Sequence, residues 1–220
     1  MTQAEQRLRL KYLCIHGHNG LAHPKCFDKK NGPVPERIGF ADIESSNLRA
    51  SFGIVYSYCI KEKDGPMIAR SVTLQDLHKG EYDKNLMRKF IEDAEQFDRL
   101  IFHYGSDMRF DIPFLRTRCE YWGLEFPRRG LIHISDTYPI LRNKFKLHSN
   151  RLEAACDFFE IDSKGHKMNP RIWLMMISGN KRLMKKALAY ILQHNKEDVI
   201  SLEELWKRTG KYTKLGKSGI

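Results

Sequence analysis

The stretch RIGFADIE, residues 37–44, decides the fold that we expect for this chain. Its closely spaced apolar residues predict a buried strand. Because a strand has a period of two, Asp42 and Glu44 should project from the same face. A carboxylate among apolar neighbours such as Phe40 and Ile43 is costly unless something positive neutralises it. Taken alone, however, an Asp-x-Glu pair is more often a pair of strand-end carboxylates that face solvent or pair with lysine.

The order of the remaining segments predicts a mixed α/β sheet with helices packed on it. Two more strands are expected at 51–60 and 66–72, and the short loops between them suit antiparallel neighbours. Apolar periodicity then predicts a helix at 83–97, a strand at 99–104, a helix at 112–123, a strand at 131–135, and helices at 136–143, 150–159, 170–178 and 181–208.

Two further carboxylates are candidates for a shared site. Asp111, in FDIPFL, stands at the start of an expected helix, which it would alternatively cap. Asp198 falls inside the apolar stripe of the last helix, and His194 lies one turn earlier at the edge of that stripe. A core histidine bonded to a core aspartate is the alternative for this pair.

Together, Asp42, Glu44, Asp111 and Asp198 indicate a metal site more strongly than any one of them does. Hard oxygen ligands of this number suit Mg²⁺ or Mn²⁺. Two such ions about 4 Å apart can act on a phosphodiester by in-line displacement.

Three motifs resemble those of the DEDD superfamily of 3'-to-5' exonucleases, which includes polymerase proofreading domains, ribonuclease T and oligoribonuclease. They are FADIESSN (40–47), HYGSDMRFDIPFL (103–115) and HNKEDVISLEEL (194–205). The resemblance covers roughly 37–208. It implies a ribonuclease H-like mixed five-stranded sheet flanked by helices, and a nuclease that uses two Mg²⁺ or Mn²⁺ ions.

By position, the resemblance also implies a role for each motif residue. Asp42 would bridge both ions, Glu44 and Asp198 would complete the shell of the first, and Asp111 would support the second. His194 would be the general base. The histidine branch of the family has four residues between this histidine and the aspartate, whereas three separate His194 from Asp198, as in the tyrosine branch.

Several other residues are candidates for contacts around the site. The resemblance places Ser45, Ser46 and Asn47 against the terminal nucleotide, although an ordinary polar turn is an equal alternative. His103, which stands where many relatives have an asparagine, is a further candidate for a contact with the substrate. Asp136 is interpreted as a helix cap or as a group that supports a ligand. Basic side chains that could contact phosphate are Arg142, Lys144 and Lys146, or Lys181, Arg182, Lys185 and Lys186, though such clusters are often only solvated faces.

Charge and composition favour a polyanionic partner. Thirty-eight Lys and Arg against 27 Asp and Glu give a net charge of +11, which favours nucleic acid, and the motifs favour its single-stranded 3' end. No apolar run is long enough to span a membrane and the N-terminus lacks a signal-peptide core, so we expect a cytoplasmic protein. Cys59, Cys119 and Cys156 are expected to be buried reduced thiols.

The expected organisation is a basic Cys/His-rich extension at 1–35, a nuclease domain at 36–208 and a basic tail at 209–220. The extension contains CIHGHNGLAHPKC, and five of its residues are candidate ligands of one structural Zn²⁺: Cys14, His16, His18, His23 and Cys26. Because this segment has too few apolar residues for a core, metal would have to fold it. A flexible arm that touches nucleic acid is the alternative.

Other functions stay open at this point. The same fold and ions could serve an endonuclease acting on structured or single-stranded substrates. A nucleic-acid binding module that has lost activity is a third reading, whose usual mark would be a missing carboxylate.

Overall fold

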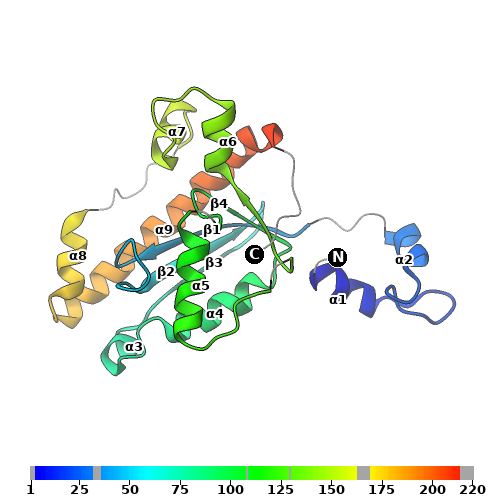
Figure 1. The fold of residues 1–220 in the computed structure, drawn as a ribbon, viewed down its shortest axis with the longest axis horizontal. Coiled ribbons are helices and arrows are strands. Elements are labelled where there is room, and N and C mark those ends of the chain that lie inside the picture. Colours follow the sequence, from blue (N-terminus) through cyan, green and yellow to red (C-terminus); the bar gives the residue numbers. More distant parts are fainter. Residues whose placement is uncertain (1–2, 32–35, 108, 129, 163–168, 214–220) are drawn as a thin grey trace.

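A five-stranded sheet forms the centre of the molecule in the computed structural model, which describes residues 3–31, 36–107, 109–128, 130–162 and 169–213 (Figure 1). The strands are β1 (Ile38–Ser45), β2 (Val55–Glu62), β3 (Met67–Ser71), β4 (Arg99–Phe102) and β5 (His133–Asp136). Their spatial order is β3-β2-β1-β4-β5. β1, β2 and β3 pair antiparallel, whereas β4 and β5 run parallel to β1. The expected mixed five-stranded sheet is confirmed.

The helices follow the expected order with small shifts at their ends, except for α3 (Leu74–Lys79), which the sequence pattern did not predict. In the part of the chain after the extension they are α3, α4 (Lys84–Ala94), α5 (Asp111–Tyr121), α6 (Thr137–Lys144), α7 (Leu152–Phe158), α8 (Pro170–Ile177) and α9 (Lys181–Thr209). A short 3₁₀ turn, Gly210–Tyr212, follows α9. The rest of the expected basic tail, 214–220, lies outside the described residues.

The two faces of the sheet are covered by different helices. On one face, Tyr58 of β2 packs edge-on against Phe90 of α4. On the other, Phe40 of β1 and Cys59 of β2 share a buried cluster with Val199 of α9. Alternation along β1 therefore assigns Phe40, Asp42 and Glu44 to the α9 face.

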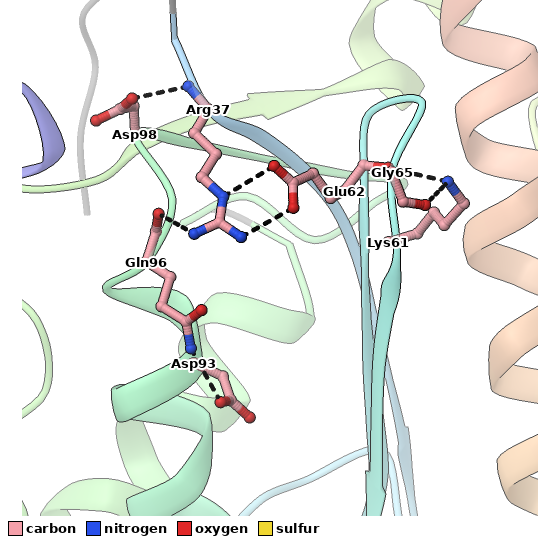
Figure 2. Close-up of polar contacts among 7 residues, drawn as sticks. All are labelled: Arg37, Lys61, Glu62, Gly65, Asp93, Gln96 and Asp98. Atoms are coloured by element: carbon pink, nitrogen blue, oxygen red, sulfur yellow. Dashed lines mark hydrogen bonds and ion pairs between the residues drawn. The ribbon is translucent and has the colours of Figure 1, made fainter.

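Arg37, the residue immediately before β1, is held in place by polar contacts (Figure 2). The backbone N–H of Arg37 donates to Asp98, 2.7 Å, and its guanidinium donates to both carboxylate oxygens of Glu62, 2.9 and 2.8 Å. A further bond of 3.3 Å reaches the Gln96 carbonyl. These bonds anchor the beginning of β1, and the candidate carboxylates lie toward its other end.

A buried ion pair joins the loop before α4 to α5. Asp83, fully buried, accepts hydrogen bonds of 2.8 Å from Nε and Nη2 of Arg118 and 2.8 Å from Nε1 of Trp122. It also accepts from the backbone N–H of Val55, 3.0 Å. Because every bond satisfies a buried charge or donor, this group ties β2, α4 and α5 together.

The extension contains two helices that the sequence pattern did not predict, α1 (Gln3–Lys11) and α2 (Pro24–Asn31). They lie apart from the sheet in Figure 1. The breaker cluster that we interpreted as a linker, 32–35, lies outside the described residues. Within the described ranges, no helix combines the length and apolar character needed to cross a bilayer.

Candidate functional site

Asp42 and Glu44 lie on the β1 face that α9 covers. In the antiparallel register Asp42 stands opposite Cys59 and Glu44 opposite Ser57, and an irregularity in the ladder follows at Ser45. Both carboxylates are partly buried. The period of the strand, read from the sequence, therefore places two acidic groups between a sheet and a helix.

The facing turn of α9 brings three polar side chains to these carboxylates. His194 Nε2 lies 3.6 Å from Glu44 Oε1 and 3.5 Å from Asp198 Oδ2. Asn195, fully buried, donates from Nδ2 to Asp42 Oδ2 at 2.5 Å. Helical spacing explains the arrangement, because residues three and four apart share one face.

Asp111 reaches the same region from another element. It is the first residue of α5, and its Oδ1 accepts a 3.2 Å hydrogen bond from the backbone N–H of Ile43. β1 pairs with β4 only as far as Phe40, so the N–H of Ile43 is left for this carboxylate. Its side chain is not the helix cap that we considered as its alternative, since Phe110 holds the cap position without a side-chain bond.

A glycine makes room for Asp111. A Cβ on Gly105 would lie 2.7 Å from Asp111 Oδ2 and 2.6 Å from the Cβ of Phe102. Neither contact is tolerated without a shift of the surrounding structure. Gly105 therefore permits the loop after β4 to pass close to the carboxylate.

The pKa values of Asp42 and Glu44 are raised by burial and by the neighbouring carboxylates. Burial, and then repulsion from Asp111, Asp198 and Glu44, raises the pKa of Asp42 well above its usual value, although the bond from Asn195 opposes this. Burial and repulsion from Asp198 and Asp111 raise the pKa of Glu44 to about 8. The mutual repulsion means that all four groups lie close enough to sense one another.

The pKa values of the other two carboxylates are raised as well, and burial is the main cause. Burial raises the pKa of Asp111 to about 7, against the hydrogen bond from Ile43. Burial also raises the pKa of Asp198, which the neighbouring His194 opposes. Such perturbed groups in one place are typical of functional sites.

The donor set fits divalent cations. One ligand atom each from Glu44, His194 and Asp198 lies within 4.8 Å of the other two, and the partly buried Asp42 and the buried Asp111 add carboxylate oxygens beside them. Concentrated carboxylate oxygens need compensating positive charge, which Mg²⁺ or Mn²⁺ supplies with the oxygen ligands that these ions prefer.

Asp136 supports the site from behind, as the sequence suggested. Its side chain caps α6 by accepting from the N–H of Tyr138, 2.9 Å. It also accepts from the backbone N–H groups of Tyr104 and Ser106, at 2.9 and 3.1 Å. These bonds hold the loop that leads from β4 to Asp111.

His103 is used within the protein. Its Nδ1 lies 2.8 Å from Thr137 Oγ1 and its Nε2 3.0 Å from the Asn150 carbonyl. Burial lowers its pKa. With both ring nitrogens engaged, this geometry favours a structural role over the substrate contact that we predicted.

The polar residues after β1 form a turn. Ser45 Oγ donates to the Asn47 carbonyl, 2.8 Å, and Ser46 Oγ accepts from the Ile54 N–H, 2.9 Å. Asn47 Oδ1 accepts from the Arg49 N–H, 3.0 Å. Their side chains stabilise the loop, while contact with a nucleotide stays a prediction.

The structure also places the remaining candidates. The seven basic residues at 142–146 and 181–186 are all exposed, and Cys59, Cys119 and Cys156 are buried free thiols as expected. Four of the five candidate zinc ligands gather into one group, Cys14, His16, His23 and Cys26, and His18 lies outside it.

Comparison with known proteins identifies the family. A family model of the RNase_H superfamily matches residues 39–209, and the chain therefore belongs to this superfamily. At the level of the family, the match supports a nuclease that acts on nucleic acid.

A solved structure has a similar fold. The chain resembles the family B DNA polymerase from the hyperthermophilic archaeon Pyrobaculum calidifontis, with a TM-score of 0.61 at 18% sequence identity. The similarity covers 80% of this chain and 25% of the polymerase chain, so it concerns the fold of one part of that protein. No curated protein matches the chain.

Proposed function

We propose that the protein is a 3'-to-5' exonuclease that hydrolyses phosphodiester bonds at a single-stranded 3' end with two Mg²⁺ or Mn²⁺ ions. The observation that carries this proposal is the convergence of Glu44, His194 and Asp198 within 4.8 Å, beside the partly buried Asp42 and the buried Asp111. The three exonuclease-like motifs in the sequence contain all five residues.

Each of the four carboxylates would bind one or both of the metal ions. Asp42 interacts electrostatically with all three other carboxylates and would touch both ions. Glu44 and Asp198 would complete one shell, and Asp111 would serve the other. Bound there, the ions would supply an activated water and stabilise the charge on the leaving 3' oxygen. Asn195 keeps one oxygen of Asp42 oriented.

His194 is the proposed general base. Its Nε2 is the ring nitrogen that faces Glu44 and Asp198, so this atom would orient the attacking water and accept its proton. The two carboxylates hold the ring in place. An imidazole has the near-neutral basicity that this task requires.

Substrate binding would rest on charge and on exposed apolar groups. The net charge of +11 favours a polyanion, and the basic side chains at the start of α9 are exposed. In the loop between β1 and β2, Leu48 and Phe52 are 84% and 80% exposed. Apolar side chains in this position could stack against the bases of a single strand.

The test is cleavage of 5'-labelled single-stranded DNA and RNA with and without Mn²⁺. We expect a metal-dependent ladder that shortens from the 3' end, and neither Asp42→Ala nor Asp198→Asn should produce it. Asp198→Asn should still bind the strand, because the basic surface is unchanged. Glu204→Gln, an exposed change on the same helix, is the matched control and should cut like the parent.

Each other outcome has a distinct meaning. Cleavage of a circular single strand, which has no 3' end, would show that the protein is an endonuclease rather than an exonuclease. Binding without any cleavage would leave an inactive nucleic-acid binding module. If Asp198→Asn cut as fast as the parent, its assignment to the metal site would be wrong.

A further inference from the structure

The N-terminal extension contains a second group of metal-ligating atoms, far in sequence from the carboxylates. Cys14 Sγ lies 3.5 Å from His23 Nδ1 and 3.7 Å from His16 Nδ1, and Cys26 Sγ lies 3.8 Å from His16 Nδ1. All four ligand atoms lie within 4.8 Å of one another.

These distances match a tetrahedral zinc site. Zn–S and Zn–N bonds of about 2.3 and 2.0 Å at tetrahedral angles imply sulfur–nitrogen separations of about 3.5 Å. Two thiols and two imidazoles complete a closed structural shell, with no position left for substrate. We propose that Cys14, His16, His23 and Cys26 bind one structural Zn²⁺, and that His18 does not.

Local backbone structure explains how the ligands converge. The Cys14 N–H donates to the His18 carbonyl and the Gly17 N–H to the Cys14 carbonyl, both at 2.9 Å. Gly17 adopts φ of 74°, a left-handed conformation that glycine favours. This tight turn brings His16 back over Cys14.

The second pair of ligands comes from the start of α2. The Cys26 N–H donates to the His23 carbonyl, 3.1 Å, so the two residues lie on one helical turn. Pro24 between them begins the helix, a position that proline suits. A turn and a helix start therefore each supply one Cys and one His.

His18 is excluded by its placement. His16 and His18 are both exposed, but only the His16 ring is within reach of both thiols, at 3.7 and 3.8 Å. The His18 ring packs against the ring of His23, with centroids 4.8 Å apart, and stays outside the group. The backbone carbonyl of His18, rather than its ring, supports the turn. The sequence alone could not choose between His16 and His18.

The extension also needs the ion for its stability. Among described residues 3–31, the buried apolar side chains are Cys14 and Phe27, and Ile15 is 95% exposed. Packing of Tyr12 and Arg9 against Phe27 adds little further core. A segment below about 40 residues with so small a core usually requires a metal or disulfides.

The zinc content of the full chain, purified under reducing conditions, tests the proposal. We expect about one zinc per chain, retained in His18→Ala and in the active-site variant Asp42→Asn, and nearly absent in Cys26→Ser and His23→Ala. Replacement with Co²⁺ gives a second readout, because thiolate-to-cobalt charge-transfer absorption can arise from Cys14 and Cys26 and not from the carboxylate site.

The zinc site does not depend on the proposed nuclease activity, so either proposal can be wrong while the other holds. Hydrogen exchange should show that zinc removal exposes amides of residues 3–31 and leaves those of the sheet protected. Protein with reduced Cys14 and Cys26 that neither contains zinc nor takes it up would overturn the proposal. Zinc content equal to the parent in Cys26→Ser, or lost in His18→Ala, would contradict the ligand set.

Discussion

Asn195 of α9 donates a hydrogen bond from Nδ2 to Asp42 Oδ2 of β1, 2.5 Å away and 153 residues earlier in the chain. The amide is fully buried. It opposes the rise in the Asp42 pKa. Asn195 is therefore a positioning residue for the carboxylate that would bridge both ions.

Asn195→Ala should lower kcat for cleavage by about 10-fold to 100-fold, because groups that orient metal ligands contribute on this scale. The Mn²⁺ concentration required for half-maximal activity should rise in parallel. Gln193→Ala, an exposed change two residues away, is the control and should alter neither quantity. Parent-like metal dependence in Asn195→Ala would mean that the hydrogen bond only stabilises the fold.

His194→Ala should reduce kcat by about 10²-fold to 10⁴-fold and leave KM nearly unchanged, because a general base acts on the proton transfer. His194→Gln retains a polar group without the basic nitrogen and should be equally slow. A pH–rate profile distinguishes the base from a structural role: the acidic limb of the parent profile should be lost in both variants. If the limb persists, another group accepts the proton.

Metal-free stability should fall as pH rises between about 4 and 8. The folded-state pKa values of Glu44 and Asp111 are raised to about 8 and about 7, whereas the unfolded chain releases these protons near pH 4. In that window the folded state binds more protons, so its stability is greatest at the acidic end and is lost as pH rises through the raised pKa values.

Asp111→Asn tests this directly, because the amide oxygen can still accept from the Ile43 N–H but does not titrate. In EDTA, Tm of the variant should decline less steeply with pH than that of the parent. For the parent, the increase in Tm on adding Mn²⁺ should be larger at pH 8 than at pH 6, because bound metal favours deprotonated ligands. If Tm declined with pH equally steeply in the two proteins, the raised pKa assigned to Asp111 would be wrong.

Asp83→Ala should destabilise the nuclease fold by about 3–5 kcal/mol, because it leaves the buried Arg118 without its partner. Urea unfolding monitors the change. Glu125→Ala removes the exposed partner of Arg128 and should cost less than about 1 kcal/mol. Equal effects from the two variants would show that the buried pair contributes no more than a surface one.

Much of the fold followed from local sequence patterns. Buried strands with few breakers predicted β1 and β4, and the long apolar stripe predicted α9. β2 begins at Val55 rather than at 51, because residues 46–54 form a hydrogen-bonded loop. α3 was missed, although Thr73 and Asp76 form a capping box that is readable from the sequence.

The site was harder to read where tertiary contacts decide the role of a residue. The period of a strand and of a helix was enough to select Asp42, Glu44, His194 and Asp198. Asn195 was missed because an uncharged amide beside a histidine gives no signal until the helix is docked on β1. α1 and α2 were missed because their apolar content is low and they are held together by tertiary contacts, those of Arg9 with Asp28 and Phe27.

The most direct test of the central claim is a crystal structure of the protein soaked in Mn²⁺, with anomalous scattering used to locate the ions. The account predicts two anomalous peaks about 4 Å apart, enclosed by Asp42, Glu44, Asp111 and Asp198. No manganese peak at these side chains, or peaks only at other surfaces of the molecule, would contradict it.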